Sequence, residues 1–182
     1  DFCRTVTACR SCGASDLETV LDFGEPFISD FVTAEQVGMR APLVAARCAT
    51  CGLVQLAHIV DPEYLFRHYN YRSGTNASMR AALKDVVDDA LGHVTLSPGD
   101  SVLDIGANDG TLLGNYPRGG ITRWAFEPAR NLHGRLEEHA DVVIGKFWPS
   151  MSAITSWPGQ AEPKFKVITS IASFYASNNP NE

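Results

Sequence analysis

The sequence predicts an α/β protein in which a small domain built on four cysteines precedes a parallel sheet. Near the N-terminus, four of the five cysteines form two C-x-x-C pairs, and a glycine follows each pair. From about residue 99 onward, apolar segments of strand length alternate with amphipathic segments, which is typical of a parallel sheet with right-handed crossovers. These observations divide the chain into three regions, 1–60, 61–98 and 99–182.

Composition fits a globular protein of one good domain or two small ones. The 182 residues are 45% hydrophobic and 20% charged, with a net charge of -6. The negative charge disfavours a nucleic-acid partner. No apolar run approaches the roughly 18 residues of a membrane span, and no secretory signal opens the sequence. We therefore expect a cytoplasmic protein with neither nucleic-acid nor membrane partners.

The first region, 1–60, is expected to bind zinc as a zinc ribbon-like domain. Two residues between paired cysteines let both thiolates turn toward one ion, and the following glycines, Gly13 and Gly52, allow a tight turn. Disulfides or a redox-active pair are the less favoured alternatives, because no secretory signal is present and there are two pairs. Cys3 is left over as a free thiol. The expected ligands are Cys9, Cys12, Cys48 and Cys51.

The second region joins an aromatic segment to a helix. Tyr64, Phe66, Tyr69 and Tyr71 lie within eight residues of one another. The following segment, "NASMRAALKDVVDDALGHV", places its apolar residues at helical spacing and its charges on the opposite face. Asn76 or Ser78 can cap the start of this helix, and Gly92 can end it.

The third region is expected to form about four parallel strands of a Rossmann-like domain. Strand-like segments lie at 101–106, 122–128, 141–147 and 165–175, and helical segments lie between them at 109–116, 129–140 and 149–157. Ligands of such sheets bind at the carboxyl ends of the strands, where the strand order reverses. The first strand ends in "VLDIGANDGTLL", and we place the cofactor there.

This glycine-rich turn favours S-adenosylmethionine over a nicotinamide dinucleotide. An asparagine replaces the second glycine of the dinucleotide fingerprint, and the acid Asp104 would repel a pyrophosphate. A carboxylate instead favours the sulfonium and ammonium groups of S-adenosylmethionine. Glu127, after the second strand, can accept both ribose hydroxyls. The alternative is a plain turn in which Asp109 caps a helix. The expected cofactor residues are Asp104, Gly106, Asn108, Asp109, Gly110, Glu127, Phe147 and Ser170.

The motifs "ACRSCG", "RCATCG", "YNYRSGTNASM", "VLDIGANDGTLL", "FEPA" and "VITSIASFY" follow one another in this order. Together they resemble the bacterial S-adenosylmethionine-dependent C-methyltransferases of TDP-linked deoxysugars. The resemblance implies an N-terminal zinc domain, a central methyltransferase domain and a C-terminal domain like a second α/β unit. It also implies methylation of a ring carbon of a TDP-4-keto-deoxysugar, through an enolate, in antibiotic deoxysugar biosynthesis.

The same resemblance places an active-site tyrosine at Tyr71, whose phenol could hydrogen-bond the ketone oxygen as negative charge develops. Packing of the aromatic segment between domains is the alternative. The general base of the family would lie beyond Glu182, so we expect a fragment that is inactive alone. A missing C-terminal portion or a partner would cover the strand near 167–175. Two other functions stay open: an O- or N-methyltransferase on the same scaffold, and a non-catalytic zinc-binding module.

Overall fold

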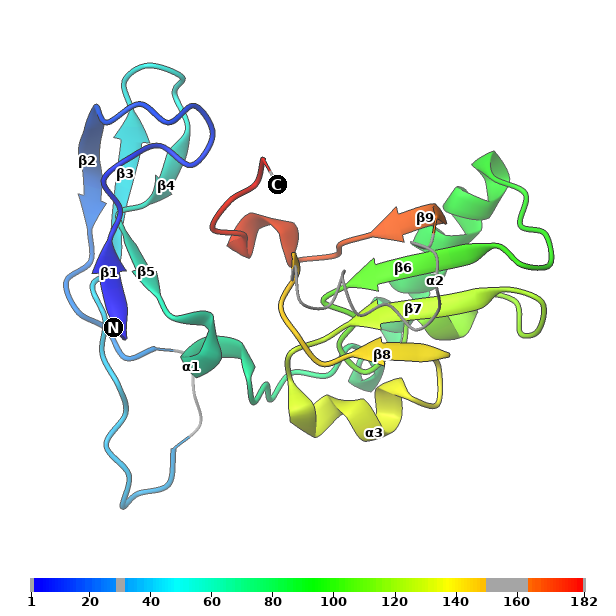
Figure 1. Ribbon diagram of the computed structural model, residues 1–182. Coiled ribbons are helices and arrows are strands. Elements are labelled where there is room, and N and C mark those ends of the chain that lie inside the picture. Colours follow the sequence, from blue (N-terminus) through cyan, green and yellow to red (C-terminus); the bar gives the residue numbers. More distant parts are fainter. Residues whose placement is uncertain (1, 29–31, 150–163, 182) are drawn as a thin grey trace. The chain divides into compact units, whose positions relative to one another are not determined.

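The computed structural model describes residues 2–28, 32–149 and 164–181. The chain falls into two compact units, one formed by Asp1–Asn70 with Tyr175–Glu182 and the other by Tyr71–Phe174. Each unit has its own sheets (Figure 1). The middle region predicted from the sequence is thus divided, because its short helix α1 (Pro62–Phe66) falls in the first unit and its long helix α2 (Ala77–His93) in the second.

The first unit contains two small antiparallel sheets (Figure 1). In one, β1 pairs with β5, and in the other the strand order is β2-β3-β4. The strands are β1 (Cys3–Thr5), β2 (Leu17–Asp22), β3 (Val44–Cys48), β4 (Val54–Leu56) and β5 (His58–Val60). Asp61 caps α1 by accepting a hydrogen bond from the backbone N–H of Glu63.

The apolar core of this unit is small. Its buried hydrophobic residues are Cys9, Ala41, Ala46, Cys48 and Ile59. Larger apolar side chains, such as Phe23 (63% exposed) and Val54 (59% exposed), remain at the surface of the unit. So little buried apolar area gives a small domain limited stability. Such domains are usually stabilised further by a bound metal or by disulfides.

The second unit is built on a four-stranded parallel sheet in the order β8-β7-β6-β9, which confirms the α/β prediction. The strands are β6 (Ser101–Ile105), β7 (Thr122–Phe126), β8 (Val142–Ile144) and β9 (Phe165–Thr169). The order reverses at β6, because β7 lies on one side of it and β9 on the other. The carboxyl end of β6 is therefore the switch point at which open α/β sheets bind their ligands.

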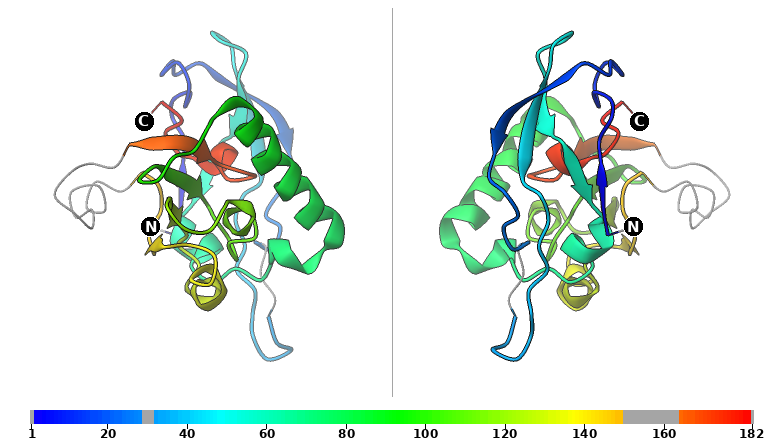
Figure 2. Two further views of the ribbon diagram at one scale, coloured as in Figure 1. Left: turned by 90° about the vertical axis from the view of Figure 1, so that its right-hand side faces the viewer. Right: turned by 90° about the vertical axis from the view of Figure 1, so that its left-hand side faces the viewer.

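Alternation along the strands gives the sheet two apolar faces. Val102 and Ala125 face a cluster that includes Leu83 and Val87 of α2, so α2 covers this side of the sheet (Figure 2). Leu103 and the aromatic residues of β7 form a second cluster on the other side. Asn76 caps α2 by accepting a hydrogen bond from the backbone N–H of Ser78, as its position in the sequence predicts.

Several connections are shorter or less regular than the sequence predicts. After β6 and β7 the chain forms only η2 (Leu113–Asn115), η3 (Arg130–Leu132) and α3 (His133–Leu136). β9 ends at Thr169, and η4 (Phe174–Ala176) follows in place of the predicted continuation to residue 175. The strand cannot continue because Ala172 takes a left-handed conformation (φ 53°) and Ser173 Oγ donates to the carbonyl of Ile105. The predicted helix at 149–157 lies outside the described residues after residue 149.

Candidate functional site

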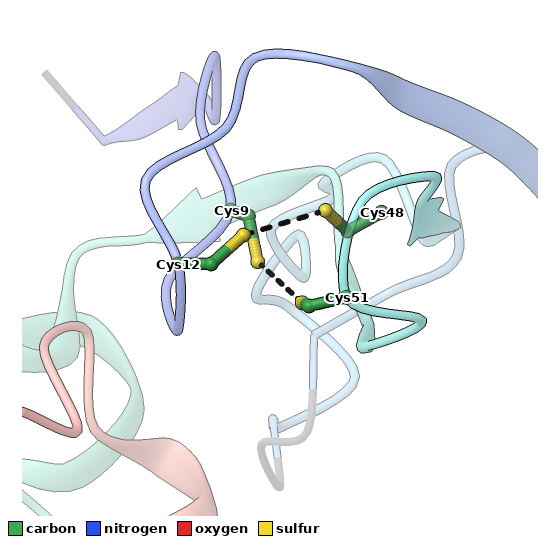
Figure 3. Close-up of side chains that lie close together, drawn as sticks. All are labelled: Cys9, Cys12, Cys48 and Cys51. Atoms are coloured by element: carbon green, nitrogen blue, oxygen red, sulfur yellow. Dashed lines mark hydrogen bonds between the residues drawn. The ribbon is translucent and has the colours of Figure 1, made fainter.

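The four paired cysteines meet in one cluster in the first unit (Figure 3). Their sulfur atoms all lie within 4.8 Å of one another. Cys9 Sγ is 3.6 Å from Cys51 Sγ, and Cys12 Sγ is 3.7 Å from Cys48 Sγ. A tetrahedral zinc site with bonds of about 2.3 Å separates its sulfur atoms by about 3.8 Å. The cluster therefore has the dimensions of a four-sulfur zinc site, as its spacing in the sequence predicts.

Matching turns place the two pairs. The backbone N–H of Gly13 donates to the carbonyl of Cys9, and the N–H of Gly52 donates to the carbonyl of Cys48. Both glycines adopt positive φ angles, 75° and 79°, which side chains with a Cβ rarely take. These turns fold each C-x-x-C segment so that both of its thiols face one point.

The thiol pKa values show that the cluster needs a cation to ionise fully. The backbone N–H of Cys12 is the main cause that lowers the pKa of Cys9, to about 6. The N–H of Leu53 lowers the pKa of Cys51, but the thiols of Cys12 and Cys9 outweigh it and raise that pKa to about 12. Four thiolates repel one another unless a metal ion lies between them, so this donor set fits Zn²⁺.

Gln55 braces the first cysteine pair, a role that the sequence pattern does not reveal. Its side chain is 93% buried, since only 7% is exposed. Its Oε1 accepts from the backbone N–H of Arg10 at 2.8 Å, and its Nε2 donates to the carbonyl of Ala8 at 3.3 Å. A strand residue that lies 45 positions later in the sequence thus fixes the backbone on both sides of Cys9.

The glycine-rich turn of the second unit leaves the carboxyl end of β6 through three left-handed residues. These are Gly106, Asn108 and Gly110, with φ angles of 74°, 54° and 80°. A Cβ on Gly106 would meet Ser173 at 2.8 Å, and one on Gly110 would meet His139 at 2.9 Å. Both positions therefore require glycine for the fold itself, in addition to any approach of a ligand.

Asp104 is a buried acid in β6, at the edge where the turn begins. Its side chain is 3% exposed and accepts a hydrogen bond from Thr169 Oγ1 at 2.7 Å. Burial raises the pKa of Asp104 to about 7, and the nearby Glu127 adds to the rise although the hydrogen bond from Thr169 opposes it. Burial raises the pKa of the nearby Tyr116 to about 12, and the negative charge of Asp104 adds to this rise.

Glu127 follows β7 and lies beside the turn. Its Oε2 accepts from the backbone N–H of Asn108 at 2.7 Å, and its Oε1 accepts from the N–H of Ala129 at 2.7 Å. Burial is the main cause of its raised pKa. Each carboxylate oxygen has two acceptor positions, so each could accept one further hydrogen bond from a ligand hydroxyl.

The side chains of Asn108 and Asp109 bind backbone of the aromatic segment. Asn108 Oδ1 accepts from the N–H of Ser73 at 2.9 Å, and Asp109 Oδ2 accepts from the N–H of Gly74 at 2.9 Å. Asp109 Oδ1 also accepts from both the N–H and the hydroxyl of Thr111, so it caps the following turn as well. These two polar residues therefore position the segment 71–74 next to the glycine-rich turn.

The remaining predicted residues occupy different surroundings. Tyr71 is 47% exposed, so its phenol is accessible. Ser170 Oγ lies 2.7 Å from Ser173 Oγ, just beyond the end of β9. Phe147 is half-buried and follows β8 by three residues. Asp104, the glycine-rich turn and Glu127 thus lie together at the carboxyl ends of β6 and β7, and Ser170 lies at the neighbouring strand end.

Comparison with known proteins identifies relatives of both units. Residues 9–66 match a family model described as "Putative zinc binding domain" (Methyltransf_13). The chain is also 30% identical over 148 residues to the C-methyltransferase NovU of Streptomyces niveus, and the match covers 79% of this chain and 35% of that protein. The chain thus spans about a third of the length of this curated relative. No helix among the described residues is long and apolar enough to cross a membrane.

Proposed function

We propose that this chain, which is similar to a C-methyltransferase and matches a zinc-binding family model, provides the zinc domain and the cofactor site of an S-adenosylmethionine-dependent C-methyltransferase. The observation that supports this proposal most directly is the position of two buried acids, Asp104 and Glu127, beside the glycine-rich turn at the switch point of the sheet. The similarity to NovU supports the same reaction class.

The residues at the turn fit a cationic, non-phosphate cofactor. Asp104 and Glu127 are 3% and 6% exposed, and each is a carboxylate whose pKa is raised by burial. Two buried acids favour a ligand that carries positive charge and hydroxyl donors, and they disfavour a pyrophosphate. S-adenosylmethionine carries a sulfonium, an ammonium and two ribose hydroxyls, and when bound it supplies an electrophilic methyl group.

The roles of the chain's own residues follow from their positions. We assign Glu127 to the ribose hydroxyls, because both its oxygens keep an acceptor position. We assign Asp104 to the ammonium side, because it lies one residue before the end of the strand from which the turn departs. Tyr71 presents an exposed phenol on the segment that Asn108 holds beside the turn, and a phenol there could donate to a ketone oxygen of the acceptor.

The substrate that we propose is a nucleotide-linked keto-deoxysugar, whose acidic carbon beside the ketone accepts the methyl group. Removal of its proton leaves an enolate, and a hydrogen bond from Tyr71 would stabilise the negative oxygen. The enolate carbon would then take the methyl group as the bond between methyl and sulfur breaks, which leaves S-adenosylhomocysteine. The relative NovU is a C-methyltransferase, so O- and N-methylation are the less favoured alternatives.

Isothermal titration calorimetry with S-adenosylhomocysteine tests the cofactor site in the full native polypeptide. Glu127→Gln should weaken binding about 10-fold or more, because hydrogen bonds to a charged group contribute about 1.5–3 kcal/mol each. Glu137→Gln removes an exposed carboxylate outside this site and should leave affinity unchanged. Binding of NADH without binding of S-adenosylhomocysteine would contradict the proposal.

The acceptor is tested separately by incubating the same polypeptide with S-adenosylmethionine and a TDP-4-keto-deoxysugar. Carbon NMR of the product distinguishes a new C-methyl from an O-methyl or N-methyl group. A C-methyl product supports the proposed reaction, and an O-methyl product would assign the same cofactor site to a different transferase.

A further inference from the structure

A cavity of about 430 Å³ lies within the second unit, beside the glycine-rich turn and not at the strand ends. One wall is formed by η1 (Ser73–Thr75) and the start of α2, and the other by η2 with α3. Its volume is in the range of small-molecule sites. We call it the arginine cavity because Arg72, Arg80 and Arg135 line it together with Thr111, Asn115 and His139.

The arginine cavity is cationic in a chain whose net charge is negative. Three arginines line it, and their guanidinium groups stay protonated at all physiological pH values. The opposing carboxylates are Asp109 and Glu138. Asp109 is already engaged by the backbone N–H of Gly74 and by Thr111. Within residues 2–28, 32–149 and 164–181, neither Arg72 nor Arg135 forms an ion pair, so their charge is not neutralised by the described protein.

Local contacts fix the walls of the arginine cavity. Arg80 Nη1 donates to the carbonyls of Gly74 at 2.7 Å and Thr75 at 3.3 Å, which anchors its guanidinium while its other nitrogens remain available. On the opposite wall, Gly114 allows the His139 ring to approach closely, because a Cβ there would lie 2.7 Å from His139 Nδ1. These contacts engage one nitrogen of Arg80 and do not involve Arg72 or Arg135.

We propose that the arginine cavity binds a phosphoryl anion, such as a diphosphate, beside the cofactor turn, with which the cavity shares Asp109 alone of the expected cofactor residues. A guanidinium group can donate two parallel N–H hydrogen bonds to one phosphate. Three arginines that line one cavity therefore offer enough donors for more than one phosphate group. Thr111 and Asn115 add neutral hydrogen-bonding groups to the lining. The anion could be free inorganic diphosphate or the diphosphate of a nucleotide.

Calorimetric titration of the full native polypeptide with inorganic pyrophosphate tests this inference. Arg72→Gln and Arg135→Gln should each weaken binding about 10-fold or more, because each removes charge-assisted hydrogen bonds. Arg130→Gln is the matched control, since Arg130 is an exposed arginine of the same unit that does not line the cavity. Thermal melting of each variant should be unchanged, because Arg72 and Arg135 are exposed.

The source of the anion is distinguished by a parallel titration with TDP. Tighter binding of TDP than of pyrophosphate assigns the site to a nucleotide, and equal affinity assigns it to a free anion. Absence of pyrophosphate binding, or equal weakening by Arg130→Gln, would overturn the proposal. Competition between pyrophosphate and S-adenosylhomocysteine would also overturn it, because the cavity would then belong to the cofactor site. Noncompetitive binding of both ligands supports two sites, whichever methyl acceptor the enzyme uses.

Discussion

Asn108 donates a hydrogen bond from its side-chain Nδ2 to the carbonyl oxygen of Tyr71 at 3.1 Å. The same side chain accepts from the backbone N–H of Ser73 through Oδ1 at 2.9 Å. An asparagine that lies in the glycine-rich turn therefore holds the backbone on both sides of Arg72. Because Asn108 also donates its own N–H to Glu127, one residue connects the tyrosine segment to the acid proposed to bind the cofactor.

Replacement of Asn108 by glycine should detach this segment. Glycine tolerates the left-handed φ of 54° at this position, so Asn108→Gly isolates the loss of the two side-chain hydrogen bonds. We expect the free energy of unfolding of this unit to fall by about 1–2 kcal/mol. Hydrogen exchange should show faster exchange at residues 72–75.

Asn108→Ala serves as the companion variant. It loses the same bonds and adds the strain of a Cβ in the left-handed region, so it should cost about 1 kcal/mol more than Asn108→Gly. Equal stability of wild type and Asn108→Gly would mean that the contacts between Asn108 and the tyrosine segment do not form in solution.

The sequence was sufficient to predict the cysteine cluster, because each C-x-x-C pair and its glycine form a local turn whose geometry depends on few other residues. It was also sufficient for the parallel sheet, because the apolar strands and their alternation with amphipathic segments are local patterns. Both predictions depend on chemistry contained within a few consecutive residues.

The contacts that Asn108, Gln55 and Thr169 make could not be predicted from local sequence patterns. Asn108 binds backbone 35 and 37 residues away, in an irregular segment with no periodicity. Gln55 binds backbone 45 and 47 residues away, and Thr169 meets Asp104 only because β9 pairs with β6. These contacts depend on register and on irregular backbone, which hydrophobic patterns do not specify. For the same reason the sequence predicted β9 and the helix after β7 to be longer than they are.

The cysteine cluster should hold one equivalent of zinc. Elemental analysis of freshly purified protein should find it, and Cys48→Ser should lose most of it because this ligand is fully buried and one of four. Hydrogen exchange in β2 and β3 should then accelerate by about 10-fold or more, while β6 and β7 keep their protection. Cys3→Ser is the control, because Cys3 lies outside the cluster and should leave the metal content at one equivalent. Zinc-free wild-type protein with an intact first unit would refute the metal assignment.

Tyr71→Phe should reduce turnover without altering the fold. The phenol is 47% exposed, so its removal should change the melting temperature little. If it donates to the ketone oxygen, loss of one such donor should lower kcat about 10- to 1000-fold. Steady-state kinetics on a TDP-4-keto-deoxysugar with the full native polypeptide give this comparison.

Tyr64→Phe is the matched control for that measurement. Tyr64 is similarly exposed at 53% but packs edge-on against Phe2, and its hydroxyl has no proposed role. Its variant should keep wild-type turnover. Equal kcat values for wild type and Tyr71→Phe would remove Tyr71 from the list of catalytic residues and favour a packing role.

The buried acid Asp104 should make stability and cofactor affinity depend on pH in opposite directions. Its pKa is about 7 in the folded protein against 3.8 for an ordinary aspartate, so between these values the folded state binds more protons than the unfolded state. The free energy of unfolding therefore decreases as the pH rises from about 4 to about 7, and it levels off above that pH. Between pH 5.5 and 8 we expect a decrease of about 2 kcal/mol from this group. Glu127, whose pKa is also raised, contributes in the same direction.

Asp104→Asn tests this assignment, because asparagine keeps an acceptor for Thr169 Oγ1 but carries no charge. Denaturant unfolding at several pH values should show a smaller decrease of stability in this variant than in wild type. Asp85→Asn, on the exposed face of α2, should keep the wild-type slope of stability against pH.

Affinity for S-adenosylhomocysteine should rise with pH through about 7 in wild type, as ionised Asp104 attracts the ligand's ammonium, and should stay nearly flat in Asp104→Asn. A wild-type slope of stability in Asp104→Asn would show that another group titrates, and a wild-type pH profile of binding would show that Asp104 does not face the cofactor.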